Sequence, residues 1–299
     1  MEKIIDKNIS ETAGMGPQSI VLSDADKHFP AEYIEVEPNV RLHIADAGKG
    51  PSVILIHGWP LSDEMYEYQY NDLIKNNFRV ISITLRGFGK SDKPYGSYTY
   101  DVHALDIKKI LCRLDIKDAV LGGFSMGGAI AIRFASTDNG AHVSKLALFS
   151  AAAPSWVQRN NYPYNFKKNE VDELIQLSYK DRPRLLSNFG KIFSATKTSL
   201  SEGISQWIYG IGLSSSAYAM TQSLIALRDT DLRADLEKIE IPTLIMHGKK
   251  DKVCSFDMAE QMKMLLKNSS LIPFQNSGHA LFIEEADKFN KEFIRFAKK

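Results

Sequence analysis

Gly123-Phe124-Ser125-Met126-Gly127 follows the apolar run Ala119-Val120-Leu121 after one further glycine, Gly122, and opens a mostly small, apolar stretch that reaches Ala135. A Gly-x-Ser-x-Gly sequence between a strand and a helix is typical of a nucleophile elbow, a turn so sharp that its serine is strained. Glycines flank the serine because a Cβ there would collide with the neighbouring strand or helix. The first N–H groups of the helix would favour negative charge beside Ser125. A Gly/Ser-rich turn without chemistry is the alternative, so the context decides.

Two further residues complete a triad in the chain order that such a turn requires. A serine is a poor nucleophile until a histidine takes its proton and a carboxylate orients that histidine, and here the expected order is serine, acid, histidine. Residues 242–251 read as a buried strand leading into a loop that carries Asp251. Residues 271–274 read as a short strand, and His279 lies on the loop that follows. All three side chains fall outside the carboxyl ends of strands, where an open parallel sheet builds its site.

Other histidines and acids compete for these two roles. His57 and His247 each precede a glycine at a strand end, where a ring braces a loop more readily than it acts as a base. The other histidines lie in less suitable places, namely His28, His43, His103 and His142. As acids, Asp257 would complement a helix dipole, and a charged, turn-like stretch favours solvated side chains for Asp229 and Asp231. The sequence therefore favours His279 as the base and Asp251 as the acid.

Acyl transfer also needs N–H donors aimed at the oxygen that becomes negative. One is expected from the main chain of Met126, the residue after the nucleophile, and the second from the loop after an earlier strand. Residues 52–56 form such a strand, which runs into His57-Gly58-Trp59-Pro60. Because Pro60 has no N–H, Trp59 is the expected donor, with its indole lining the pocket. Plain packing of Trp59 is the alternative.

Apolar, β-branched runs alternate with helical stretches along most of the chain. After an early pair of strands within residues 33–45, buried strands are predicted at 52–56, 78–84, 119–121, 145–149, 243–246 and 271–274. Helices are predicted at 65–75, 100–114, 126–136, 256–266 and 281–297. This alternation predicts an α/β fold, a mostly parallel twisted sheet with helices on both faces.

One region breaks the alternation. Between residues 154 and 236 no strong strand occurs, and we expect helical pieces separated by Pro183, Gly190, Gly203, Gly210 and Gly212. Such an excursion is too long for a plain crossover, so a helical cap folded over Ser125 is predicted. Aromatic side chains of this region should pack the cap onto the core, and some should face an apolar pocket: Trp156, Tyr162, Tyr164, Phe166, Trp207, Tyr209 and Tyr218.

Several motifs carry a resemblance to a known family. They are His57-Gly58-Trp59-Pro60-Leu61-Ser62, Arg86-Gly87-Phe88-Gly89-Lys90-Ser91-Asp92, Gly123-Phe124-Ser125-Met126-Gly127-Gly128, His247-Gly248-Lys249-Lys250-Asp251 and Gly278-His279. From about Tyr33 onward the chain resembles an α/β-hydrolase, and in particular the bacterial aryl esterases and cofactor-free haloperoxidases (perhydrolases). The resemblance implies Ser125 as nucleophile, Asp251 as acid, His279 as base and Trp59 and Met126 as oxyanion donors, with no cofactor.

Two departures from the family pattern stand out. The family usually has an acidic residue before the Arg-Gly-Phe-Gly turn, where this chain has Thr84-Leu85. Members also usually start near Tyr33, so about thirty residues are extra here. Neither departure touches the triad, but the first bears on the details of the pocket.

Composition excludes several classes of protein. The chain has 299 residues, 44% of them hydrophobic, and a net charge of +1, which gives no basis for attraction to nucleic acid or membrane. It has no apolar run long enough for a membrane span, and residues 1–7 lack the apolar core of a signal peptide. Cys112 and Cys254 are too few for a disulfide framework, and no metal-ligand spacing occurs. We therefore expect a cytoplasmic protein without metal or cofactor.

These observations predict a domain plan and an activity. An N-terminal extension covers residues 1–30, as a tail, an edge strand or an arm to a second subunit; the hydrolase core covers 31–153 and 237–299, and the cap covers 154–236. The expected activity is hydrolysis of small or aryl carboxylic esters through an acyl-enzyme, with peroxide able to replace water. Alternatives are a C–C bond hydrolase or lactonase on the same triad, and a weakly catalytic, ligand-binding signalling hydrolase. The expected partner is a small ester, and a homo-oligomer is left open.

Overall fold

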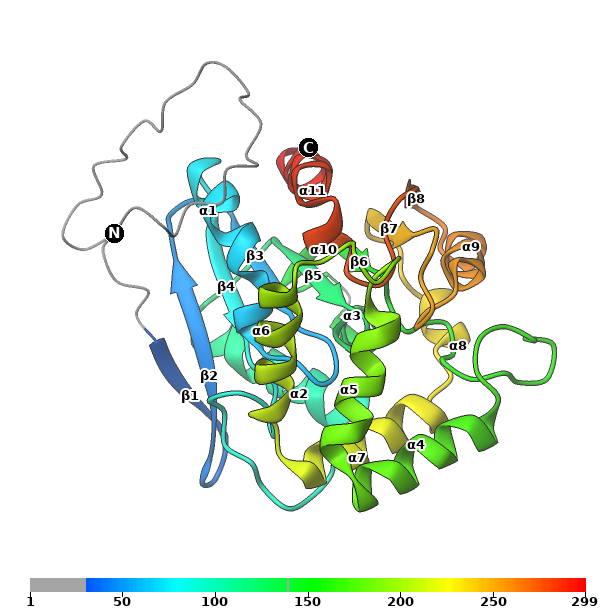
Figure 1. Ribbon diagram of the computed structural model, residues 1–299. Helices are drawn as coiled ribbons and strands as arrows, with labels where there is room; N and C mark the ends of the chain where they lie inside the picture. The colour runs from blue at the N-terminus through cyan, green and yellow to red at the C-terminus, as the bar shows by residue number, and fades with distance from the viewer. Residues whose placement is uncertain (1–30, 139) are drawn as a thin grey trace, which may run out of the picture.

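The computed structural model describes residues 31–138 and 140–299, which contain one eight-stranded sheet (Figure 1). Its strand order is β1-β2-β4-β3-β5-β6-β7-β8. The strands are β1 (Ala31–Glu37), β2 (Val40–Ala47), β3 (Ser52–Ile56), β4 (Arg79–Ile83), β5 (Ala119–Phe124), β6 (Val143–Phe149), β7 (Thr243–Gly248) and β8 (Ser269–Phe274). β1 and β2 run antiparallel to their neighbours, and β3 to β8 are parallel to one another. The predicted α/β fold with a mostly parallel sheet is confirmed.

The central strands are buried on both faces, as their apolar sequences require. In β3, Ile54 and Ile56 belong to one hydrophobic cluster, whereas Val53 and Leu55 belong to a second cluster on the opposite face. Successive side chains of a strand point to opposite faces, so one apolar run supplies both layers of the core.

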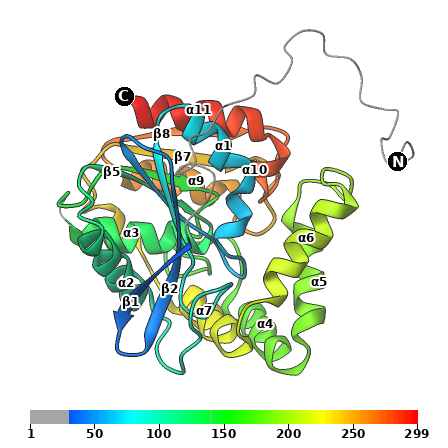
Figure 2. The ribbon, with the colours of Figure 1, turned by 90° about the vertical axis from the view of Figure 1, so that its left-hand side faces the viewer.

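Helices cover both faces of the sheet (Figure 2). One face carries α1 (Glu67–Lys75), α10 (Leu281–Glu284) and α11 (Ala286–Lys298), and the other carries α2 (Tyr100–Arg113), α3 (Met126–Asp138) and α9 (Phe256–Leu265). Two predicted helices differ in detail. The 3-10 turn η2 (Asp63–Tyr66) precedes α1, and the last predicted helix is divided at Glu285, whose φ of −129° and ψ of 51° are not helical. Glu285 instead accepts a hydrogen bond from Ser277 Oγ at 2.6 Å.

Five helices lie between β6 and β7, where the sequence predicts helical pieces. They are α4 (Lys168–Lys180), α5 (Arg182–Phe193), α6 (Glu202–Leu213), α7 (Ala217–Asp229) and α8 (Arg233–Leu236). Side chains of Asp181, Ser201 and Ser216 accept hydrogen bonds from the first turns of α5, α6 and α7, so N-caps mark these boundaries.

The expectation that glycines and Pro183 separate these helices is wrong. Gly190 lies inside α5, and Gly203, Gly210 and Gly212 lie inside α6. Pro183 occupies the first turn of α5, where its missing N–H costs no hydrogen bond. A glycine inside a helix costs only about 1 kcal/mol, which tertiary packing can outweigh.

The division of the chain into core and cap stays a prediction. Leu186 and Met220 of the α4–α8 segment share one hydrophobic cluster with Ile54 and Ile130 of the sheet layers, so the two parts pack continuously. The predictions for residues 1–30 lie outside the described residues. Within the described ranges, no helix combines the length and the apolar character that crossing a membrane requires.

Candidate active site

Ser125 lies at the turn between β5 and α3, with 6% of its surface exposed. Its φ is 53°, a left-handed conformation that costs a non-glycine residue energy. The flanking glycines make the turn possible, because a Cβ on Gly123 would lie 2.4 Å from the carbonyl oxygen of Gly127, and one on Gly127 would lie 2.3 Å from that of His57. The sequence prediction of a strained turn between strand and helix is confirmed.

Asp251 and His279 form a buried pair on neighbouring loops. Asp251 follows β7 and His279 follows β8, and these strands are adjacent and parallel, so both loops leave the same end of the sheet. Asp251 Oδ2 and His279 Nδ1 are 2.7 Å apart, and both side chains are fully buried. His279 Nε2 has no hydrogen-bond partner among the described residues, so it is free to act on a neighbouring group.

The other carboxylate oxygen of Asp251 holds its loop. Oδ1 accepts hydrogen bonds from the main-chain N–H groups of Val253 at 2.8 Å and Cys254 at 2.9 Å. Burial alone would raise the pKa of Asp251, but its interactions with His279 and His247 outweigh burial and hold this pKa below its usual value. Asp251 is therefore an oriented anion, as a partner of an imidazole must be.

His247 and His57 brace loops, in agreement with the sequence interpretation. His247 Nε2 lies 2.8 Å from the carbonyl oxygen of Cys254, which ties the end of β7 to the Asp251 loop. His57 Nε2 accepts a hydrogen bond from Leu85 N–H, and its Nδ1 donates to the carbonyl of Gly58, both at 2.9 Å. Burial lowers the pKa of His57 to about 4. Neither ring is placed to serve as a base.

Two of the three alternative acids are engaged in ion pairs elsewhere. Asp229 pairs with Arg228, and Asp231 pairs with Arg233, each at 2.7 Å. Asp257 lies in the first turn of α9, as predicted. None of the three has a recorded contact with His279 in the described ranges, which leaves Asp251 as the acid beside that ring.

The two expected oxyanion donors come from two different segments near Ser125. Met126 is the first residue of α3, and Trp59 lies on the loop after β3. In the described parts of the chain, neither main-chain N–H donates to a loop carbonyl or a side chain. The indole of Trp59 is occupied, because its Nε1 donates to the carbonyl of Met220 at 3.1 Å and its ring packs edge-on against Phe189.

Sequence reasoning missed two carboxylates. Glu284 accepts hydrogen bonds from Gly278 N–H at 2.7 Å and Ala195 N–H at 2.8 Å, so it joins the His279 loop to the segment after α5. Asp63 accepts a hydrogen bond from the Thr84 hydroxyl. Asp63 thus brings a carboxylate to the position where the family pattern led us to expect an acidic residue. The pair Glu284-Glu285 just after His279 was the available signal for the first.

Both cysteines are free thiols. Cys254 is fully buried, and burial raises the pKa of its thiol well above the usual value. A thiol of this kind stays protonated at neutral pH and is a poor nucleophile. This agrees with the sequence interpretation of Cys254 as a bystander in the chemistry, although its main chain holds Asp251.

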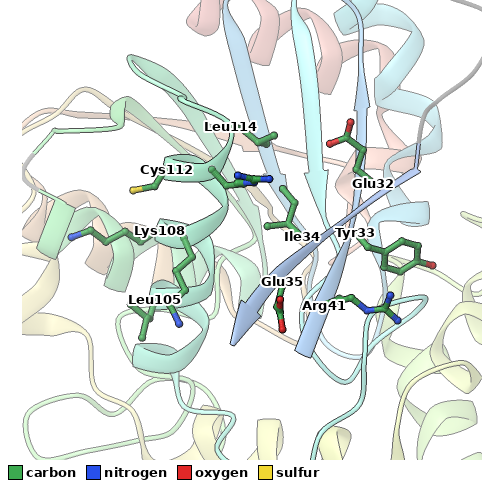
Figure 3. Close-up of a pocket in the computed structure, with 11 residues that line it drawn as sticks. Glu32, Tyr33, Ile34, Glu35, Arg41, Leu105, Lys108, Cys112 and Leu114 are labelled. Atoms are coloured by element: carbon green, nitrogen blue, oxygen red, sulfur yellow. The ribbon is translucent and has the colours of Figure 1, made fainter. Parts of the chain in front are cut away.

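One cavity of the described structure lies away from Ser125, Asp251 and His279. A volume of about 1240 Å³ lies between β1 and α2, lined by Glu32, Tyr33, Arg41, Lys108, Cys112 and neighbouring residues (Figure 3). These residues flank the antiparallel edge of the sheet, whereas Ser125, Asp251 and His279 follow β5, β7 and β8. This cavity is therefore distinct from the candidate active site.

The chain matches a family described as the alpha/beta hydrolase fold over residues 51–286. It is 46% identical over 265 residues to an AB hydrolase superfamily protein, YisY, of Bacillus subtilis (strain 168), covering 89% of this chain and 98% of that protein. Among solved structures it is similar to an esterase from Exiguobacterium antarcticum, with 41% identity and a TM-score of 0.88. It is also similar to a bromoperoxidase from Bacillus anthracis, with 30% identity and a TM-score of 0.87. Each structural match covers 90% of this chain and the whole of the other.

Proposed function

Because the chain belongs to the α/β-hydrolase fold family, we propose that it is a serine hydrolase that cleaves small or aryl carboxylic esters through an acyl-enzyme. Family membership confirms the resemblance read from the motifs. The observation that carries the proposal is the 2.7 Å bond between Asp251 and His279, which leaves Nε2 of the buried ring unpartnered in the described structure, together with the strained Ser125. The similarity to a solved esterase supports the choice of an ester.

In the proposed mechanism, the substrate carbonyl oxygen accepts hydrogen bonds from the N–H groups of Trp59 and Met126. His279 takes the proton of Ser125, whose Oγ attacks the carbonyl carbon, and Asp251 stabilises the resulting imidazolium. The imidazolium then protonates the leaving alcohol, and an acyl-serine remains. His279 next deprotonates a water, whose attack releases the carboxylic acid and restores Ser125.

Hydrogen peroxide is proposed as a second acceptor for the acyl group. Its attack on the acyl-serine would form the O–O-containing peracid and restore Ser125, with no change in the roles of Asp251 and His279. The similarity to a solved bromoperoxidase supports testing this reaction. Peracid formed from an acetate ester and hydrogen peroxide should disappear in Ser125→Ala, as should hydrolysis.

The test is hydrolysis of p-nitrophenyl esters of increasing chain length by the wild type, Ser125→Ala and Ser150→Ala. Ser150 is a matched control, because it is a buried serine with a φ of 42° at the end of the neighbouring strand β6. We expect saturable activity on short esters, a loss of about 10⁴-fold or more in kcat for Ser125→Ala, and little change for Ser150→Ala. Equal turnover by the wild type and Ser125→Ala would refute the proposal. If the wild type hydrolysed none of these esters, C–C bond substrates, lactones and ligand binding would be the alternatives to test.

A further inference from the structure

A cleft of about 540 Å³ opens between α5 and α6. The two helices lie side by side in both views (Figures 1 and 2). Its inner walls are buried apolar side chains, among them Leu61, Leu186 and Ile208. Its rim carries exposed polar and charged side chains, Lys191, Lys197, Glu202 and Gln206. An elongated apolar group with a polar outer end would fit such a lining.

The inner end of the cleft adjoins the catalytic residues. Pro60 lines it and directly follows Trp59, the expected oxyanion donor. Phe189 also lines it, and the ring of Phe189 lies 5.2 Å from that of Trp59 and 6.5 Å from that of His279, measured between centroids. Phe189 packs against both hydrophobic clusters of the molecule. An acyl chain that runs from Ser125 into the cleft would therefore pass the half-buried ring of Phe189, which would have to turn aside.

Two glycines inside the helices keep the cleft open. A Cβ on Gly212 would lie 3.2 Å from a methyl of Leu186 and 3.4 Å from Pro60 Cγ, so the floor is already tight there. A Cβ on Gly190 would meet nothing within 4 Å, so this position faces open space in the cleft lining. A helical glycine costs about 1 kcal/mol relative to alanine. At Gly190, the absence of a side chain leaves the cleft unobstructed.

We propose that the α5–α6 cleft binds the acyl chain of an ester with an unbranched aliphatic acid, such as an octanoate. The inference rests on the proposed esterase function and names the substrate class of the same site. Each methylene that leaves water for the cleft wall contributes about a fourfold gain in kcat/KM. The buried walls hold the chain, and the charged rim leaves its far end near solvent.

The test compares Gly190→Leu with Gly210→Leu on p-nitrophenyl acetate and octanoate. Gly210 is a matched control, because it is also a helical glycine whose Cβ would meet nothing within 4 Å, and it does not line the cleft. We expect Gly190→Leu to lower the ratio of kcat/KM for octanoate to that for acetate by about tenfold or more, since a leucine side chain would displace several chain methylenes. Gly210→Leu should keep the wild-type ratio.

Each outcome decides one claim. An unchanged ratio in a folded Gly190→Leu, or an equal fall in Gly210→Leu, overturns the acyl-chain cleft while ester hydrolysis stands. If the wild type hydrolyses neither ester, the proposed function itself fails. If Gly190→Leu does not fold, Gly190→Ala takes its place, and a smaller fall in the same ratio supports the cleft while a wild-type ratio overturns it.

Discussion

The two carboxylate oxygens of Asp251 have different hydrogen-bond partners. One orients the imidazole of His279, and the other accepts two N–H groups that fix the loop on which Asp251 itself lies. His247 reinforces the same loop through the carbonyl of Cys254. These bonds hold the loop closed and tie it to the end of β7, which fixes Asp251 beside the imidazole.

Glu284 gives the His279 loop a comparable support, which leads to a prediction. The Glu284 carboxylate accepts one hydrogen bond from each of two main-chain N–H groups. In Glu284→Gln, one of these N–H groups would face the amide NH₂ and lose its acceptor. An unpaired buried donor costs about 1–3 kcal/mol. We expect kcat for ester hydrolysis to fall about tenfold, with a smaller change in KM. Steady-state kinetics on a short ester measures this.

The matched control is Glu292→Gln, which alters a carboxylate of α11 that pairs with Arg295. It should leave kcat near the wild-type value. A Glu284→Gln enzyme with wild-type kcat would show that the loop keeps its geometry without the carboxylate.

The positions of the three proposed triad residues could be predicted because each one follows a strand that the sequence marks clearly. Ser125, Asp251 and His279 lie where strand, glycine and loop occur in a fixed order. Glu284 could not be predicted, because its role depends on bringing Gly278 and Ala195 together, and these are distant in sequence. Asp63 was missed for the same reason, since its partner Thr84 belongs to another loop.

At the scale of the elements, strands were predictable from sequence and the α4–α8 helices were only partly so. Buried parallel strands are nearly continuous apolar runs, a local signal. Helix limits between β6 and β7 were misplaced because glycine was taken as a breaker, whereas Asp181, Ser201 and Ser216 set the limits as N-caps. Among these glycines, Gly212 is close-packed, because a Cβ there would lie 3.2 Å from Leu186, and a propensity scale does not contain such packing.

Because glycine has a low helical propensity, we predict that Gly210→Ala stabilises the protein. Gly210 is exposed within α6, and a Cβ there would meet nothing within 4 Å. Alanine loses less conformational freedom on folding, so the free energy of unfolding should rise by about 0.5–1 kcal/mol. Denaturant titration measures the change.

Gly212→Ala is the natural comparison, because its Cβ would lie 3.2 Å from Leu186. It should gain less than Gly210→Ala or lose stability. A destabilised Gly210→Ala would mean that α6 is held by something other than its own helical propensity.

For the molecule as a whole, buried histidines make folding sensitive to acid. Burial, assisted by the charge of Arg86, lowers the pKa of His103 to about 3, and burial lowers that of His57 to about 4. Between these values and 6.5, the unfolded chain binds protons that the folded chain does not. Stability therefore falls as the pH drops through this window, by about 1.4 kcal/mol per pH unit for each ring.

His103→Phe should flatten this dependence. His103 is fully buried in α2, and neither ring nitrogen has a hydrogen-bond partner in the described structure, so an apolar ring suits the site. Between pH 6.5 and 4.5, the variant should lose about 2 kcal/mol less unfolding free energy than the wild type. Urea titrations at several pH values measure the two slopes. Parallel slopes would show that His103 is already protonated in the folded protein.

The two borders of the sheet also limit aggregation between molecules. Within the described residues, β1 has a strand on one side only, and it carries exposed Glu32 and Glu35. At the other border, β8 contains Pro273, which has no N–H to offer an incoming strand. Charge and proline are the features that discourage edge-to-edge stacking of sheets. The folded protein should therefore tolerate high concentration without forming intermolecular β-structure.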